Sequence, residues 1–427
     1  MSTTGPQESA TCLPQELLEL VLEQLHASGD AASLKNTAMA HSSLLETSQK
    51  YIFNEVQLSE INTHSVFSAT KTLVRKLSDI LEESSHLGDY VRVLRIEESW
   101  DYSSSLTWYS WIYEDGALPK VLFRLPNLQE LSFQPHYVLS YSGMTPHLRG
   151  ALEQACTLST LVTLSMFNLR GLPMAVLQQL PQSLRHLRLW DVTLVHGGER
   201  TQAADGARLE HLALKLQQDD FARLAARLLE PDSSVRVEGL QNLTITAETP
   251  HCHQTMKMLL AAAGTVYKRW NFGHVSRSGH DSQDVQLTEM SSLRLLALAG
   301  LHLEQEISPF HWLLYVLQSA THVEQFQLHF VAEIWDIDAC WYWTSAWNLL
   351  DMFLTSRMKN IVSVSIFLDV KGYTRQDTER PAYIVDDVKG FLPRLCAGGR
   401  VSVETKQLHD EDLLLRVDSL TKYQHSP

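Results

Sequence analysis

The sequence predicts an α/β protein in which three short N-terminal helices precede a long array of units, each with one strand and one helix. Three observations support this: an amphipathic helical pattern over residues 13–25, a leucine-rich phrase that returns many times after residue 56, and helical stretches between its copies. Units of this kind stack side by side into a curved solenoid whose strands line the concave face. We expect a disordered tail over 1–12, the helical module over 13–55, the array over 56–405 and a polar tail over 406–427.

Composition narrows the classes of partner. With 427 residues, of which 44% are hydrophobic, the chain can bury a large core. Its 35 basic and 49 acidic side chains give a formal charge of −14, which repels nucleic-acid phosphate and anionic lipid. We therefore expect neither nucleic acid nor a membrane as a partner. No apolar run is long enough to span a bilayer, so the expected location is the cytoplasm or the nucleus.

The first three helices can be read from residue spacing. Apolar residues at positions 14, 17, 18, 21, 22 and 25 follow the i, i+3, i+4 spacing of one helical face. A Ser-Gly-Asp break at 28–30 ends this helix, and Asp30 can cap a second one. A third helix is expected from about Leu44 to Phe53. Three such helices bury little surface alone, so they need a partner or the domain that follows.

The opening helix carries a family resemblance. Leu13-Pro14-x-Glu16-Leu17-Leu18-x-x-Val21-Leu22-x-x-Leu25 resembles the start of the F-box, and the resemblance covers residues 13 to about 55. Many F-boxes have a cysteine and a tryptophan before the third helix, where this chain reads Ala40-His41-Ser42-Ser43-Leu44. The resemblance implies docking into a Skp-type adaptor and, through it, onto a cullin scaffold. The adaptor-binding residues would be Leu13, Pro14, Leu17, Leu18, Val21 and Leu22. Alternatively, these side chains pack the helices as a cap on the repeats.

The remaining chain repeats an LxxLxL-like phrase whose last two apolar positions alternate with polar ones, as in a strand with one buried face. The middle positions of successive copies lie 23 to 53 residues apart, and a degenerate copy near 267–272 would divide the longest step. Helical patterns occur between copies, at 220–229 and 255–262. The last strand is expected at Val401–Val403. We predict that one leucine from each of six copies is buried and that these stack as a ladder: Leu131, Leu164, Leu187, Leu212, Leu243 and Leu296.

These phrases are similar to leucine-rich repeats of irregular length. An F-box followed by irregular repeats is similar to a large class of fungal F-box proteins, and the tract Trp347-Asn-Leu-Leu-Asp351 resembles a phrase that recurs there. The resemblance implies a substrate-recruiting subunit of an SCF-type E3 ubiquitin ligase, which binds a protein client through its repeats. A ligase-independent interaction scaffold is the alternative function.

Two insertions between repeat strands are rich in aromatic residues. Seven of the ten tryptophans lie in residues 100–113 and 335–347. Rings of this kind often form the energetic centre of an interface, so the candidate client-binding residues are Trp108, Trp111, Trp341 and Trp343. If the solenoid is curved, the two insertions could flank its concave face. Packing of long insertions onto the repeats is the alternative interpretation, which the sequence favours.

No catalytic or cofactor motif is apparent. The sequence has no HExxH, GxSxG, GxxxxGK[ST] or GxGxxG pattern. The five cysteines form no CxxC pair, and the adjacent residues of His251-Cys252-His253 would alternate faces on a strand. We therefore expect a protein that is not an enzyme and binds no metal or cofactor.

Overall fold

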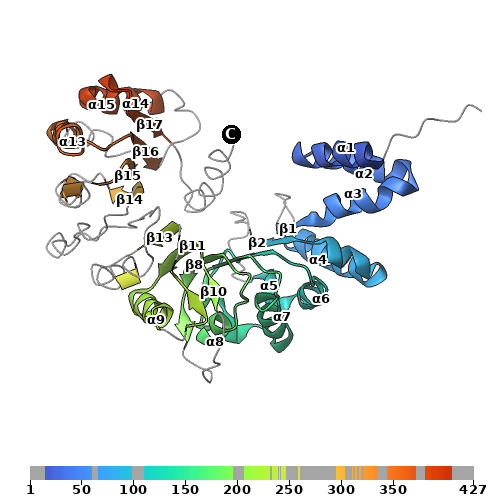
Figure 1. The fold of residues 1–427 in the computed structure, drawn as a ribbon. Helices are drawn as coiled ribbons and strands as arrows, with labels where there is room; N and C mark the ends of the chain where they lie inside the picture. Colours follow the sequence, from blue (N-terminus) through green and yellow to red (C-terminus); the bar gives the residue numbers. More distant parts are fainter. Residues whose placement is uncertain are drawn as a thin grey trace, which may run out of the picture. The chain divides into compact units, whose positions relative to one another are not determined.

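The structure is a computed structural model that describes residues 15–59, 66–98, 110–195, 206–230, 233–238, 240, 242–246, 258–259, 295–302, 310, 313–314, 317–318, 322–333, 344–371 and 380–405. Its contacts form two compact units, Met1–Leu164 and Ser165–Pro427. The fold is mixed α/β with parallel strands (Figure 1). Across the described residues, no helix combines the length and the apolar character that crossing a membrane requires.

Three N-terminal helices are present where the sequence predicts them: α1 (Gln15–Ala27), α2 (Ala31–Ala40) and α3 (Ser42–Asn54). The break between α1 and α2 depends on Gly29, whose φ of 74° is readily adopted only by glycine. The Asp30 side chain accepts a hydrogen bond from the Ser33 backbone N–H at 2.9 Å, so it caps α2 as predicted. The predicted tail over 1–12 lies outside the described residues, as do Leu13 and Pro14.

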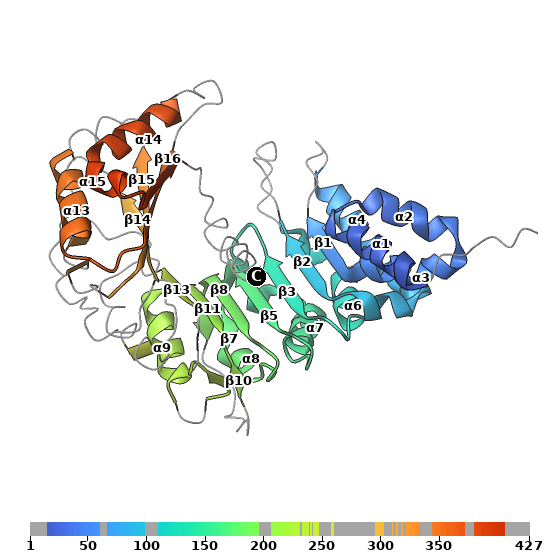
Figure 2. The same ribbon diagram turned by 45° about the horizontal axis from the view of Figure 1, so that its top comes forward.

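In the first unit, parallel strands follow these helices. Strands β1 (Glu55–Ser59), β2 (Val93–Glu97) and β3 (Glu130–Gln134) pair in chain order, and β5 (Thr163–Phe167) begins at the end of this unit. Their phrases pair in register, with Val56 opposite Leu94 and Leu94 opposite Leu131. Helices and short elements connect the strands: α4 (Val66–Glu83), η1 (Ser85–Tyr90), α5 (Trp111–Glu114), α6 (Ala117–Phe123), β4 (Leu139–Ser140), η2 (Tyr141–Gly143) and α7 (Pro146–Cys156). Helices α4, α6 and α7 lie along one side of these strands (Figure 2).

The second unit contains two further runs of parallel strands. Strands β8 (His186–Val192), β11 (His211–Leu216) and β13 (Asn242–Thr246) pair with Leu212 opposite both Leu187 and Leu243. A four-stranded sheet is formed by β14 (Leu295–His302), β15 (Gln325–Glu333), β16 (Ser363–Lys371) and β17 (Val401–Thr405). Its central register joins Leu296, Phe326, Val364 and Val401. The helices of this unit whose bounds the structure describes are α8 (Met174–Gln178), α9 (Gln218–Leu228), α13 (Thr344–Ser356), α14 (Arg380–Phe391) and α15 (Pro393–Ala397).

The predicted burial of the ladder leucines is confirmed where the structure describes it, but Leu296 belongs to a different sheet from Leu187, Leu212 and Leu243. Leu131, Leu164, Leu187, Leu212 and Leu243 are all buried. Leu296 occupies the expected register position opposite Phe326, while its burial lies outside the described residues. Helix α9 and strand β17 also occur where predicted. The degenerate copy at 267–272 and nearly all of the helix at 255–262 fall outside the description.

Several repeat units contain more than the predicted one strand and one helix. Short second strands occur between the main ones: β6 (Leu169–Arg170), β7 (Leu172–Pro173), β9 (Leu194–Val195), β10 (Ala207–Arg208) and β12 (Val235–Arg236). Strand β7 pairs with β9, and β10 pairs with β12. Two-residue strands carry no period that sequence reasoning could detect, because a period-2 pattern needs several alternations.

The Trp347-Asn-Leu-Leu-Asp351 tract forms part of α13 and serves the core. The Trp347 ring is buried against Phe310 and Phe330, with ring centroids 4.7 and 4.8 Å apart. The buried Asp351 carboxylate accepts backbone N–H bonds from Arg394 at 3.1 Å and Leu395 at 2.9 Å. The tract therefore fills the core with its tryptophan and caps α15, more than 40 residues away, with its aspartate.

We predict that Leu212→Ala lowers the free energy of unfolding of the second unit by about 2–5 kcal/mol, because it leaves a cavity in the ladder. The matched variant Leu349→Ala truncates a leucine that is exposed on α13 and should change stability by less than about 1 kcal/mol. Denaturant unfolding of both variants measures the difference. Equal losses would contradict the central place given to the ladder.

Asp351→Ala should destabilise the protein by about 1–3 kcal/mol, because two buried N–H groups lose their acceptor. Asp351→Asn retains one side-chain oxygen and should cost less. Thermal melting of both variants checks this order. If the alanine variant proves as stable as the wild type, Asp351 does not cap α15.

Candidate partner-docking surfaces

Helix α1 presents two apolar faces with opposite environments. Leu22 is 1% exposed and packs inside the three-helix bundle, whereas Leu17, Leu20 and Val21 are 47, 59 and 54% exposed. These three occupy i, i+3 and i+4, so they lie on one side of the helix. We call Leu17, Leu20 and Val21 the α1 face. Three neighbouring exposed apolar side chains on one helix are typical of a surface that a partner covers.

The structure separates the predicted adaptor-binding residues. Leu17 and Val21 belong to the α1 face, and Leu18 is half-buried beside it. Leu22 does not lie on this surface, because its side chain packs inward. Leu20 was missed, although its spacing from Leu17 follows the i, i+3 rule. Leu13 and Pro14 lie outside the described residues.

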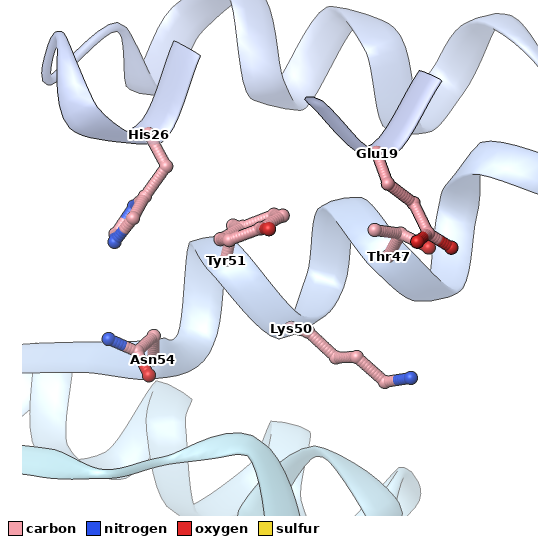
Figure 3. A pocket seen from close by; sticks show the side chains of 6 residues that line it. All are labelled: Glu19, His26, Thr47, Lys50, Tyr51 and Asn54. Atoms are coloured by element: carbon pink, nitrogen blue, oxygen red, sulfur yellow. The ribbon is translucent and has the colours of Figure 1, made fainter. Parts of the chain in front are cut away.

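A pocket of about 400 Å³ lies between α1 and α3 (Figure 3). Glu19 and His26 line it from α1; four residues of α3 at helical spacing line the other side: Thr47, Lys50, Tyr51 and Asn54. The His26 and Tyr51 rings lie with their centroids 5.2 Å apart and their planes at 32°. The pocket is therefore lined by one aromatic ring from each helix and by polar side chains.

The electrostatics of the pocket favour a neutral tyrosine and a charged lysine. Partial burial raises the pKa of the Tyr51 hydroxyl, and nearby Glu23 and Glu19 raise it further. A hydrogen bond from Lys50 to Glu46, across a 2.9 Å ion pair, raises the pKa of Lys50. Tyr51 therefore keeps its proton and can donate a hydrogen bond to a ligand, while Lys50 is already paired.

The described part of the aromatic insertions does not support client binding by Trp111. Trp111 is only 4% exposed, so its ring packs within the first unit and does not offer a contact surface. It follows Ser110, whose side chain caps α5 and donates a 2.6 Å hydrogen bond to Glu98. Burial raises the pKa of Glu98, and the hydrogen bond from Ser110 offsets part of this rise. Trp108, Trp341 and Trp343 lie outside the described residues.

The polar face of the strands is a surface that sequence reasoning did not select. In the first unit, Arg95 on β2 forms ion pairs with Glu55 on β1 and with Glu130 on β3, the latter at 3.2 Å. Beside them, Gln57 donates a 2.7 Å hydrogen bond to Glu97. Along their strands, these polar residues alternate with the buried apolar residues, so they lie on the opposite face of the sheet. These charged side chains are partly exposed and are held in place by their ion pairs. A partner could therefore form hydrogen bonds with them in a fixed geometry.

Neither models of known protein families nor curated proteins gave a match to this chain. Functional reasoning therefore depends on the two surfaces just described, the α1 face and the polar face of the strands.

Exposure of the α1 face predicts that Leu17→Asp combined with Val21→Asp leaves the melting temperature nearly unchanged. Leu22→Asp should instead cost several kcal/mol, because it places a carboxylate among the buried apolar side chains of the helical bundle. Circular dichroism melts of the two proteins compare these outcomes directly. A large loss for the double variant would show that Leu17 and Val21 pack against the protein itself.

Proposed function

We propose that the chain is the substrate-recruiting subunit of an SCF-type E3 ubiquitin ligase. Its N-terminal helices would bind a Skp-type adaptor, and through it a cullin scaffold, while its strands would hold a protein client. The chain would contribute proximity, because the transfer of ubiquitin to the client would be carried out by other subunits. The single observation that carries the proposal is the α1 face, which sits within the stretch that resembles the F-box.

The energetics of the α1 face support docking. A leucine or valine side chain contributes about 1.5–3 kcal/mol when it is fully buried. Three such residues on one side of α1 therefore provide a substantial driving force for binding a complementary groove. A helix that served only as an internal cap would leave fewer apolar side chains on its outer side.

The repeat pattern supports the second half of the proposal. In-register parallel pairing of copies such as Leu187, Leu212 and Leu243 is the arrangement that leucine-rich repeats adopt when they stack as a solenoid. We propose that the chain forms such a solenoid, with the strands' polar face as the client-binding surface. The ion-paired Glu55, Arg95 and Glu130 then favour a client with both charged and polar groups.

A ligase-independent scaffold is the competing function. The packing of Leu22 inside the helical bundle favours this function, as do the contacts of α3 with η1 and β1. In that case the α1 face would bind something other than a Skp-type adaptor. Binding to the purified adaptor distinguishes the two functions.

We expect the wild-type chain to form a stable complex with a purified Skp-type adaptor. Leu17→Asp combined with Val21→Asp should weaken binding by more than about a hundredfold, because two carboxylates would enter an apolar groove. Isothermal titration calorimetry measures the change.

The matched control is Leu349→Asp combined with Val362→Asp, which adds the same charge at two exposed apolar positions of the second unit. This control should bind like the wild type. If the wild-type chain fails to bind, or if both double variants bind equally well, the ligase proposal is wrong.

A further inference from the structure

Two consecutive copies of the repeat phrase carry histidine at the same position. The copies read Leu184-Arg-His-Leu187 and Leu209-Glu-His-Leu212, so histidine precedes the ladder leucine in both. Strands β8 and β11 pair in parallel with His186 opposite His211. Paired residues on neighbouring parallel strands lie about 4.8 Å apart and point to the same face. The register therefore places two imidazoles side by side.

A carboxylate completes the cluster. Glu210 precedes His211, and one potential ligand atom from each of His186, His211 and Glu210 lies within 4.8 Å of the others. The two imidazole rings are 4.3 Å apart between centroids and meet at 69°, edge to face. All three residues are partly exposed, so an ion can reach them from solvent. Two imidazoles and one carboxylate form a ligand set that zinc commonly takes.

Arg185 lies beside the Glu210 carboxylate. The Arg185 guanidinium donates to the backbone carbonyls of Gln182 at 2.7 Å and Leu184 at 3.0 Å. Its Nε lies 3.6 Å from one Glu210 oxygen, beyond ordinary hydrogen-bond length. Arg185 therefore forms only a long ion pair with Glu210. Beneath the cluster, Leu187 and Leu212 are buried in the ladder and hold the two strands in register.

We propose that His186, His211 and Glu210 bind a divalent metal ion of the zinc class. Two ligand atoms at about 2.1 Å from one metal can lie no more than about 4.2 Å apart, so small side-chain rotations must draw the three together. Three protein ligands leave a coordination position open on the exposed face. That position can take water or a donor atom from a bound protein. This site is independent of adaptor binding, because α1 contributes nothing to it.

The test is zinc binding by the full chain, measured by isothermal titration calorimetry with Zn²⁺ alone. Because the chain has 19 histidines, the informative quantity is a difference between matched variants. His186→Gln combined with His211→Gln should lose one equivalent of bound zinc. The control, His86→Gln combined with His147→Gln, removes two exposed histidines elsewhere and should keep that equivalent.

Glu210→Gln provides a second variant that changes a partly exposed side chain and leaves both imidazoles in place. It should weaken zinc binding by at least about tenfold, since it removes the anionic ligand. Zinc should also raise the melting temperature of the wild type but not that of the His186/His211 variant, as expected for a ligand that binds only the folded state. If the wild type, the His186/His211 variant and the control bind the same number of zinc ions with the same affinity, there is no metal site here.

Discussion

The in-register pairing of the leucine phrases is the constraint on which the described strands depend. Each phrase places its apolar residues at alternate strand positions, and a slip of one residue would turn every leucine outward. Burial of Leu131, Leu187 and Leu212 therefore fixes the register of their strands. It also fixes what lies on the opposite face. The ion pairs of Arg95 and the facing His186 and His211 both follow from that register.

The two surfaces differ in how they could bind partners. The α1 face is apolar and comes from one helix, so it suits a groove that removes it from water. The polar face of the strands is built from paired charges and half-buried polar side chains, which contribute more to specificity than to affinity. The apolar α1 face would then give affinity for a constant partner, and the polar face of the strands would give specificity for a selected client.

Much of this arrangement could be predicted from the sequence, because period-2 burial and helical spacing are local properties. The phrase around Leu212 predicted both its strand and its burial. Sequence could not tell which side of α1 is covered, because the apolar residues from Leu17 to Leu22 extend around more than one side of the helix. The inward position of Leu22 depends on its packing against the other helices. Sequence could not tell that Trp111 is buried, because a large ring suits a core as well as an interface. His186 and His211 occupy equivalent positions in two copies of the phrase. Their proximity depends on the register of β8 and β11, which the phrases alone do not give.

Hydrogen–deuterium exchange of the chain, alone and with a purified Skp-type adaptor, tests the central functional claim most directly. We expect adaptor binding to slow exchange of the backbone amides in residues 15–27 and to leave those of β2 and β3, which carry Arg95 and Glu130, unchanged. The side chains of the α1 face would then be covered while the polar face of the strands stays open for a client. Unchanged exchange across α1 in the presence of saturating adaptor, or protection confined to the strands, would contradict this division of the two surfaces.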